Sequence, residues 1–488
     1  MNLRHVLRTG LVLFLLFPFF FLLTQFGISR IPDTGELLWA FRNSFIQAFF
    51  SAFFSLALGF WAALGLIACN EASSRRRRRF ILEILCLLPN FLPPIFILLS
   101  ILNVVEPFPM GVAGIVLVHT VMNFGLAAVL LAGIMENKLG GVAELAYIEG
   151  ASRVAFFLRG LFPMLKKDFL LLGLFIFVVC FGSFAVPLIV GGGKGTTIEV
   201  LIYEKIRLSS DWGGAVLLAF LQSAFIFALS FIASRGRGAS STRLANLKLA
   251  QSYGGIAVVL FISALYLYGY VEGFFSGLSM LSTFYDLQSA LFWNFLGSLL
   301  LGVSVGVLCY VGLMAIAYCW PKAWFERFLN GYVAPSTSLA CFSLLLVGPN
   351  EGVYPFIKIP VALTLLSLNS LFRMGWDGEL HALHSQMTVA YAMGASHRQI
   401  FREVLFPQLS VRAGLLSGIA AIWACGDFAV SRILAHRDLS IAMMTETLMS
   451  GYRLNQAIVL SGLIIVAGVL CFTICVGGSG VLRRKLAP

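Results

Sequence analysis

Residues 146–163 read AYIEGASRVAFFLRGLFP, and residues 390–407 read AYAMGASHRQIFREVLFP. Both ends of this segment are shifted by the same 244 residues, and nine of the eighteen aligned residues are identical. Unrelated segments share about one residue in fifteen at ordinary compositions. The sequence therefore predicts an internal duplication, with one copy of this polar segment in each half of the chain.

The composition indicates a membrane protein. Of 488 residues, 59% are hydrophobic and 11% are charged, whereas soluble domains carry about 25% charged residues. A helix needs about 20 apolar residues to cross a bilayer. We therefore expect an all-α polytopic membrane protein with about twelve transmembrane helices, six in each half. The expected spans are 11–27, 45–69, 80–104, 112–135, 168–190, 213–233, 253–271, 291–317, 329–347, 354–372, 411–434 and 457–480.

The first apolar run, at residues 11–27, follows a basic start and has the layout of a secretory signal peptide. No small-x-small cleavage site is evident after it. We therefore expect a retained first helix, with a cleaved signal peptide as the alternative.

The net charge of +12 comes largely from basic residues between the expected spans. The run Arg75–Arg79 lies between the second and third spans, where twelve crossings and a cytoplasmic N-terminus put a cytoplasmic loop. Further basic residues fall on the same side, namely Arg4 and Arg8, Arg235, Arg237, Arg243 and Lys248, Lys322 and Arg327, and Arg483, Arg484 and Lys485. This positive-inside pattern predicts that both termini and both repeated segments face the cytoplasm. We interpret the run as a topology signal and not as a nucleic-acid-binding site.

A linker divides the chain near its midpoint. Residues 235–251 are rich in Ser, Gly, Arg and Lys, and we expect a first half at 1–240, a cytoplasmic linker at 241–252 and a second half at 253–488. Because six crossings separate the two copies, both halves should insert in the same orientation. This predicts parallel repeats related by an axis along the membrane normal, unlike the inverted repeats of many secondary transporters.

The repeated segment lies in a loop of about 30 residues between the fourth and fifth spans of each half. Gly150, Ala151 and Ser152 permit a tight turn, because glycine takes positive φ without strain. Apolar residues then recur at the spacing of an amphipathic helix, namely Val154, Phe157, Leu158 and Leu161 in one copy and Ile400, Phe401, Val404 and Leu405 in the other. The polar face is expected to hold Arg153, Arg159, His397, Arg398 and Arg402, and Pro163 and Pro407 suit the first turn of the next helix. The pattern predicts a short surface helix with one face available to a partner.

The order of Glu144, Ala146, Gly150 and Pro163 resembles the EAA motif of the permease subunits of binding-protein-dependent ABC importers. The resemblance covers nearly the whole chain, since the helix count, the loop position and the duplication also fit the fused permeases of that family. It implies the type I ABC importer permease fold, with coupling helices in the loops at about 136–167 and 373–410 that dock on a cytoplasmic nucleotide-binding subunit. The residues it assigns to coupling are Glu144, Ala146, Gly150, Ser152, Phe157, Leu161 and Pro163, with Ala390, Gly394, Ser396, Phe401, Leu405 and Pro407 in the second copy.

The two copies depart from the motif to different degrees. Leu145 stands where the family usually has alanine, and Thr388 and Val389 replace the glutamate and alanine in the second copy. A contact made by Glu144 therefore has no equivalent in the second half, whereas the glycine and proline positions survive in both. The simpler alternative is that both segments are interfacial helices that only terminate a bundle.

No energy source is visible in the sequence. The string GGGKGTT at 191–197 is not a P-loop, because Leu188 stands where the motif needs glycine and Lys194 is followed by Gly195. The six histidines and nine cysteines form no catalytic, metal-ligand or disulfide pattern. We expect no enzyme activity, metal site or cofactor in this chain. The resemblance implies that ATP and Mg are bound by a separate nucleotide-binding subunit, which forms a dimer to match the two loops. It also implies that this chain lies in the bacterial inner membrane.

Polar residues inside apolar segments point to a route through the membrane, since a charge at the bilayer centre costs about 2.5–3.5 kcal/mol on insertion scales. Asp427 in ACGDFAVSRIL is the clearest candidate for the pathway or a gate, and Ser183 stands 244 residues earlier in CFGSFAVPLIV. For Asp427, an interhelical hydrogen bond and an ion pair with Arg432 are the alternatives. His119 is a weaker pathway candidate.

The cargo is constrained only by the C-terminal region. Gly426, Asp427, Phe428, Tyr452 and Arg453 carry a similarity to the fused permeases of the thiamine and ferric-iron importer group. The resemblance implies thiamine as the first candidate and ferric iron as the second, with a polyamine or organophosphonate behind them. It also implies a periplasmic substrate-binding protein that docks on loops including 191–211 and 435–453. Two rival functions stay open: a secondary transporter in which Asp427 and His119 relay ions, and a non-transporting membrane scaffold.

Overall fold

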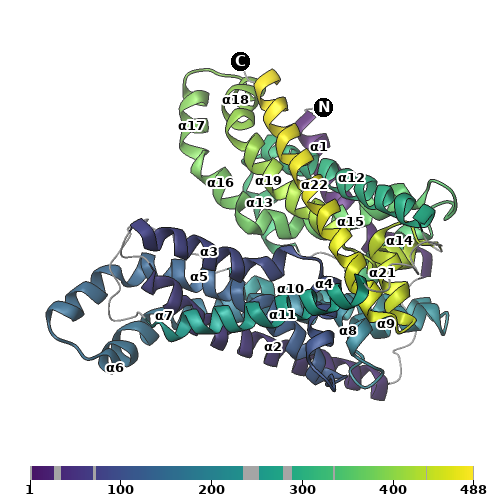
Figure 1. Cartoon of the computed structure of the whole chain (residues 1–488). Helices are drawn as coiled ribbons and strands as arrows, with labels where there is room; N and C mark the ends of the chain where they lie inside the picture. Colours follow the sequence, from purple (N-terminus) through teal and green to yellow (C-terminus); the bar gives the residue numbers. More distant parts are fainter. Residues whose placement is uncertain are drawn as a thin grey trace. The chain divides into compact units, whose positions relative to one another are not determined.

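The computed structural model describes residues 3–26, 34–69, 73–234, 252–278, 288–332, 336–435 and 437–486. Every regular element in these ranges is a helix (Figure 1), which confirms the all-α prediction. Helices are expected here because a backbone in lipid must satisfy its own hydrogen bonds. The predicted linker at 241–252, apart from Ser252, lies outside the described residues, and so does His436.

Nine helices among the described residues are long and apolar enough to cross a bilayer. They contain α1 (Leu3–Phe26), α2 (Thr34–Ala68), α5 (Val112–Ile148), α10 (Trp212–Ser234), α11 (Gly254–Leu278), α12 (Gln288–Cys319), α15 (Pro355–Leu371), α19 (Phe406–Cys425) and α22 (Leu454–Leu486). A tenth span results if α3 (Ser73–Phe91) and α4 (Pro94–Val104), bent by 102°, are counted together. The chain is therefore a multi-span membrane protein.

Two of the twelve predicted spans, 168–190 and 329–347, have no such helix in the described residues. The first falls on α7 (Phe162–Phe181), whose first turns carry three charged residues. Its remaining apolar stretch is about 20 Å long, against a bilayer core of about 30 Å. The second falls on α13 (Ala323–Gly331) and α14 (Thr337–Leu345), each nine residues long. A helix of that length covers only about 14 Å.

The run Arg75–Arg79, expected in a loop, belongs to the first turns of α3. Arginine is a good helix former, so a basic run readily extends the helix that follows it. The guanidinium of Arg79 pairs with Glu136 on α5, and its Nε lies 2.7 Å from the carboxylate of Glu83 on α3. Part of the basic run therefore joins two helices, and the loop assignment was wrong.

The chain folds into two compact units that do not coincide with the predicted halves. Unit 1 combines residues 1–32, 201–227 and 276–488, and unit 2 combines residues 33–200 and 228–275. Helices α1 and most of α10 therefore pack with elements of the second half, and α11 packs with elements of the first. The boundaries near residues 240 and 253 describe the repeat in the sequence and stay a prediction.

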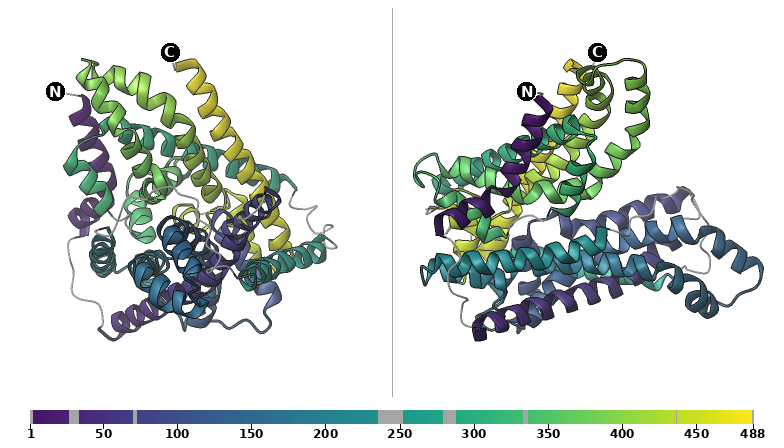
Figure 2. Two further views of the ribbon diagram at one scale, coloured as in Figure 1. Left: turned by 90° about the vertical axis from the view of Figure 1, so that its left-hand side faces the viewer. Right: turned by 180° about the vertical axis from the view of Figure 1, so that it is seen from behind.

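In unit 1, three hydrogen bonds to main-chain carbonyls hold α1 against second-half elements. The Arg8 guanidinium donates to the Cys319 carbonyl at 2.7 and 3.0 Å, and the Tyr332 hydroxyl donates to the Leu15 carbonyl at 2.9 Å. The start of α1, the end of α22 and the segment formed by α17 (His384–Ala392) and α18 (His397–Ile400) lie at one end of this unit (Figures 1 and 2).

In unit 2, α11 crosses α2 where two glycines meet. A Cβ on Gly255 would lie 2.0 Å from the Trp61 carbonyl oxygen, and a Cβ on Gly65 would lie 2.5 Å from the Ile256 nitrogen. Small residues allow membrane helices to approach this closely. A side chain at either position would force the two helices apart.

Element boundaries repeat at the offset of the sequence. Helix α7 corresponds to α19, and the short helix α8 (Ala185–Val190) corresponds to α20 (Ala429–Leu434), each shifted by 244 residues. Ser44 Oγ accepts a hydrogen bond from the Ile198 amide at the start of α9 (Ile198–Arg207), and Ser298 Oγ accepts one from the Ile441 amide at the start of α21 (Ile441–Ser450), both at 2.9 Å. The two serines are 254 residues apart and the two amides 243, so this local structure recurs in both halves without keeping the 244-residue offset.

Candidate functional site

In both repeated segments, the preceding helix ends in the same C-terminal hydrogen-bond pattern. In the first loop (136–167), the Ala151 amide donates to the Ala146 carbonyl at 2.9 Å and the Gly150 amide donates to the Tyr147 carbonyl at 3.2 Å. The second loop (373–410) repeats both bonds at 3.0 Å, from Ala395 to Ala390 and from Gly394 to Tyr391. This is the Schellman motif, whose first residue beyond the helix is left-handed. Gly150 and Gly394 meet that need with φ of 72° and 84°.

A serine then starts the next helix in both loops. Ser152 Oγ accepts a hydrogen bond from the Ala155 amide at 3.2 Å, and Ser396 Oγ accepts one from the Gln399 amide at 3.4 Å. In the second loop the Gln399 side chain also accepts from the Ser396 amide at 2.9 Å, which completes a capping box. A serine cap contributes about 1 kcal/mol. Both serines therefore have a local structural role beside the coupling role we predict.

The surface helix of each loop turns into a π-helix. The first loop runs from α6 (Arg153–Ala155) into η1 (Phe156–Leu161), and the second runs from α18 into η5 (Phe401–Leu405). Pro163 and Pro407 follow in the first turn of α7 and α19, as predicted. Each helix continues directly from the π-helical turn, in which the Phe162 amide bonds to the Phe157 carbonyl and the Phe406 amide bonds to the Phe401 carbonyl. Each proline therefore lies where the π-helical turn passes into the next helix.

A buried leucine and an aromatic ring contact attach each surface helix to its own unit. Leu161 and Leu405 are buried. The Phe157 ring meets Phe60 on α2 with centroids 5.5 Å apart, and the Phe401 ring meets Tyr318 near the end of α12 at 5.1 Å. These four residues position the loop, and the buried leucines are not available to a partner.

The exposed faces of the two loops carry different residues. In the first loop Ile148, Val154 and Leu158 are 80%, 68% and 63% exposed. In the second loop Arg398 and Arg402 stand exposed where Val154 and Leu158 stand in the first. The spacing analysis grouped Val154 and Leu158 with buried Leu161, although the π-helical turn separates them. None of these exposed side chains was among the residues that the resemblance assigned to coupling.

The prediction that His397 lies on the polar face of the surface helix was wrong, because His397 is buried. One ring nitrogen contacts the Tyr391 hydroxyl at 2.5 Å and the other contacts the Tyr318 carbonyl at 2.6 Å. The equivalent residue of the first loop, Arg153, is exposed. A histidine can fill this site since both ring nitrogens find partners. The second loop is therefore tied to α12 by an additional side chain.

The helix that leads into each loop also differs. In the first half α5 continues unbroken from Val112 to Ile148, and Glu144 is exposed on it. In the second half α15 passes through η4 (Phe372–Trp376), where Gly375 has φ of 123°, before α16 (Asp377–Ala382) and α17. Thr388, which replaces Glu144, donates its hydroxyl to the His384 carbonyl at 2.9 Å.

An ion pair closes the base of each loop with opposite polarity. Lys138 on α5 meets Asp168 on α7 at 2.8 Å, and Glu379 on α16 meets Arg412 on α19 at 2.9 Å. Asp168 and Arg412 are separated by the repeat offset of 244 residues. Lys138 corresponds to Ala382, and Glu379 lies three residues before it. The partner residue thus shifts along the helix between the copies, so these pairs were not predictable from aligned identities.

The pathway candidates lie where the next helix is interrupted. Helix α7 ends at Phe181 before α8 begins at Ala185, and Ser183 lies in that break. The Ser183 hydroxyl contacts His119 Nε2 at 3.0 Å, and His119 Nδ1 contacts the Gln47 side-chain oxygen at 3.1 Å. Two separately predicted residues, His119 and Ser183, are therefore in contact.

Asp427 lies in the equivalent break of the second half, between α19 and α20. Its carboxylate accepts a hydrogen bond from the Ser431 amide at 3.1 Å and lies 3.4 Å from the Ser431 hydroxyl, so it caps the first turn of α20. Arg432 pairs instead with Glu446 at 2.6 Å and Asp438 at 3.1 Å. The alternative of an Asp427–Arg432 ion pair was wrong, and the pathway role of Asp427 stays a prediction.

Comparison with known proteins gives relatives of one kind. No protein-family model matches the chain. The thiamine transport system permease protein ThiP of Escherichia coli is 32% identical over 220 residues, which are 41% of this chain and 40% of the relative. The ThiP of Salmonella typhimurium is 30% identical over 228 residues, 42% of this chain and 41% of the relative. The ThiP of Brucella suis is 23% identical over 397 residues, 76% of this chain and 71% of the relative.

These matches differ in how much of each protein they cover. The more similar relatives are matched over about two fifths of their length, and the match that reaches most of this chain has lower identity. Permease proteins are membrane components of transport systems and not catalysts, which agrees with the prediction of no enzyme activity and no cofactor. The chain is a multi-span membrane protein homologous, at low identity and over most of its length, to the permease proteins of thiamine ABC transport systems.

Proposed function

We propose that the chain is the membrane permease of an ABC importer, and that the first and second loops are its two coupling helices. The observation that carries the proposal is the repeated stop, cap and proline, which twice presents a short helix with an exposed face. A generic bundle end does not need the same Schellman turn and serine cap in two places. The homology to thiamine-system permeases supports the same function.

The proposed partners follow from this function. A nucleotide-binding dimer, which carries ATP and Mg, docks on the two loops, and a periplasmic binding protein docks on loops at 191–211 and 435–453. The chain resides in the bacterial inner membrane with both termini cytoplasmic. The start of α1, the end of α22 and the second loop share one end of unit 1, which supports a common side for all three (Figure 2).

We further infer two parallel repeats of six crossings. The two predicted crossings that lack a long apolar helix each have a counterpart at the 244-residue offset. Helix α7 corresponds to α19, which is part of a helix, His397–Cys425, long and apolar enough to cross a bilayer. The α13–α14 pair corresponds to the bent pair α3–α4. Counting each pair as one crossing gives the same number in both halves.

Thiamine is the proposed cargo, with ferric iron second. The relatives are named for thiamine transport, and thiamine is a cation that the Asp427 carboxylate would attract if it faces the pathway. Asp427 and the Ser183–His119 contact occupy helix breaks, where membrane transporters place their substrate-binding groups.

The test is ATP-driven thiamine uptake by the complex purified from its native membrane. In the complex reconstituted in liposomes, Gly150→Ala and Gly394→Ala together should uncouple ATP hydrolysis from uptake, because each forces a side chain into left-handed backbone at about 1–2 kcal/mol. A Cβ at either glycine meets no atom within 4 Å, so the effect comes from the backbone alone. Gly141→Ala is the matched control, since it also meets open space but lies within helix α5.

The rival functions give different results in the same liposomes. Uptake by the purified chain alone, driven by an ion gradient without ATP, would identify a secondary transporter. No flux of any cargo with all co-purified partners present would identify a scaffold. Coupled uptake retained in the double glycine variant would contradict the coupling assignment.

A further inference from the structure

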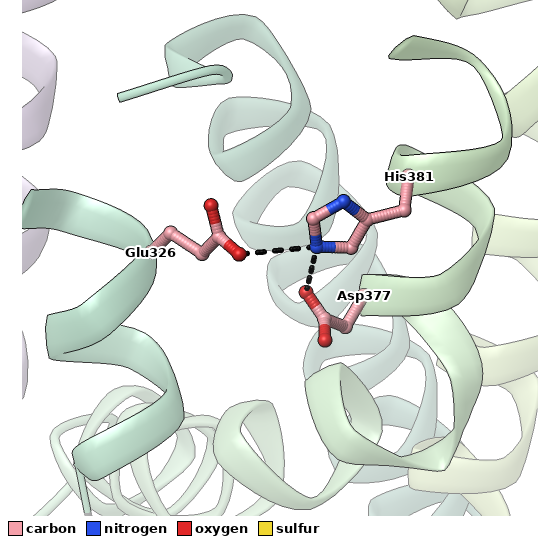
Figure 3. A group of neighbouring side chains, drawn as sticks. All are labelled: Glu326, Asp377 and His381. Carbon is pink, nitrogen blue, oxygen red and sulfur yellow. Dashed lines mark hydrogen bonds and ion pairs between the residues drawn. The ribbon is translucent and has the colours of Figure 1, made fainter. Parts of the chain in front are cut away.

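Three potential metal-binding side chains converge at the root of the second loop. Glu326 on α13 and Asp377 and His381 on α16 point their ligand atoms toward one another (Figure 3). His381 Nε2 lies 3.0 Å from Glu326 Oε1 and 3.6 Å from Asp377 Oδ1. The three ligand atoms lie within 4.8 Å of one another.

These distances suit a small cation bound by all three side chains. Bonds of about 2.0–2.2 Å to nitrogen and oxygen in a tetrahedral site separate the ligand atoms by about 3.3 Å. The observed 3.0 and 3.6 Å lie on either side of that value. The single proton on His381 Nε2 can serve only the nearer carboxylate, that of Glu326, whereas a cation would bind the imidazole and both carboxylates together.

The surroundings hold the ligands and leave an entry path. The buried Trp320 ring meets the His381 ring edge to face, with centroids 5.1 Å apart, and so fixes the orientation of the imidazole. The side chains of His381, Glu326 and Asp377 are 50%, 30% and 15% exposed. Solvent can therefore reach the site from the histidine side and occupy a fourth coordination position.

The first half of the chain joins its helices by a different kind of clamp. There Arg79 on α3 joins Glu83 and Glu136. Shifting Glu83 and Glu136 by 244 residues gives Arg327 and Leu380, neither of which is acidic. The same shift takes Arg79 to Ala323, which has no charge. The second half therefore does not keep this clamp, and Glu326, Asp377 and His381 form a cluster of their own.

We propose that Glu326, Asp377 and His381 bind a divalent first-row transition-metal cation, with Zn²⁺ as the reference ion. One imidazole and two carboxylates are ligands for Zn²⁺, Fe²⁺ or Mn²⁺, whereas Mg²⁺ prefers an octahedral oxygen shell. The cation ties α16 to α13 at the start of the second loop. The proposal needs no assumption about what the chain transports.

The test is cation binding by the purified full chain. Titration with Co²⁺ should give the visible absorption of one low-coordinate ion per chain, and Zn²⁺ should displace it while equimolar Mg²⁺ does not. Glu326→Gln and His381→Ala should each weaken binding at least tenfold. His384→Ala is the matched control, because His384 is an exposed histidine of the same segment outside the cluster. Zn²⁺ should also slow amide exchange in α16 and α17 of the unaltered chain.

Several results would overturn the site. No saturable Co²⁺ binding by the unaltered chain would do so, as would equal loss from His384→Ala and His381→Ala. X-ray absorption of the Zn²⁺-loaded chain should show one imidazole with oxygen ligands. A sulfur-rich shell would assign the ion to the cysteines instead, and this measurement is independent of how well the variants fold.

Discussion

Val154 and Leu158 form the exposed face of the first loop, whereas Arg398 and Arg402 occupy the same positions in the second. Beneath these faces the two loops share a Schellman turn, a serine cap, an aromatic anchor and a proline. The residues identical between the copies therefore mainly build the loop. The residues that differ between the copies supply the surface that a partner would touch.

This difference means that the two loops would bind a symmetric partner by different forces. Burying exposed valine and leucine side chains contributes about 1.5–3 kcal/mol each when burial is complete and depends little on ionic strength. Attraction between exposed arginines and an acidic groove weakens within about 8–10 Å at physiological salt. The first loop would thus provide a salt-resistant contact, and the second a salt-sensitive one.

The largest expected effect comes from reversing each face. Val154→Asp with Leu158→Asp should lower the affinity for the nucleotide-binding partner at least tenfold at every salt concentration, because charged groups would have to be buried. Arg398→Asp with Arg402→Asp should lower it at least tenfold in low salt and much less in high salt. Binding of the partner to the chain in nanodiscs, measured at two ionic strengths, checks both.

The control for this comparison is Tyr253→Asp, which changes an exposed aromatic residue outside both loops and should leave partner binding unchanged. If the salt dependence of binding responds equally to both double changes, the two loops do not differ in the way their surfaces suggest.

Sequence reasoning predicted the elements with a strong local signal. The Gly150 turn and the Pro163 helix start were predictable because left-handed backbone favours glycine and the first helical turn accepts proline. The long apolar runs behind α2, α5, α12 and α22 were predictable from the length of a membrane crossing. These features depend on a few neighbouring residues.

Features that depend on the fold could not be predicted in this way. Hydropathy could not distinguish one crossing at 329–347 from the end of α13 followed by the short apolar helix α14. Arg79 and His397 were assigned to exposed positions by their polarity, but each finds partners on another helix. The assignment of α1 and α11 to opposite units depends on contacts such as Gly255 with α2 that have no local pattern.

His397 offers a test of how firmly each loop is held. Because His397 is buried with partners on both ring nitrogens, His397→Ala should remove two hydrogen bonds and destabilise the second loop by about 2 kcal/mol. Arg153→Ala, at the exposed equivalent position, should change stability by no more than about 0.5 kcal/mol. Amide exchange in residues 153–161 and 397–405 measures both, and an equal effect of the two changes would mean that the second loop has no additional tether.

The smallest expected effect concerns the reversed ion pairs at the base of the loops. Lys138→Glu places a carboxylate opposite Asp168 and should destabilise the first loop by up to about 1 kcal/mol, because the pair is partly exposed. Adding Asp168→Arg gives the first loop the polarity that Glu379 and Arg412 have in the second, and it should restore most of the loss. Thermal unfolding in detergent at low and high salt checks this, since the gain from the second change should shrink as salt rises. If the doubly reversed chain stays as unstable as the single variant, then the local surroundings fix the sign of each pair, and the attraction alone does not explain why both copies keep one.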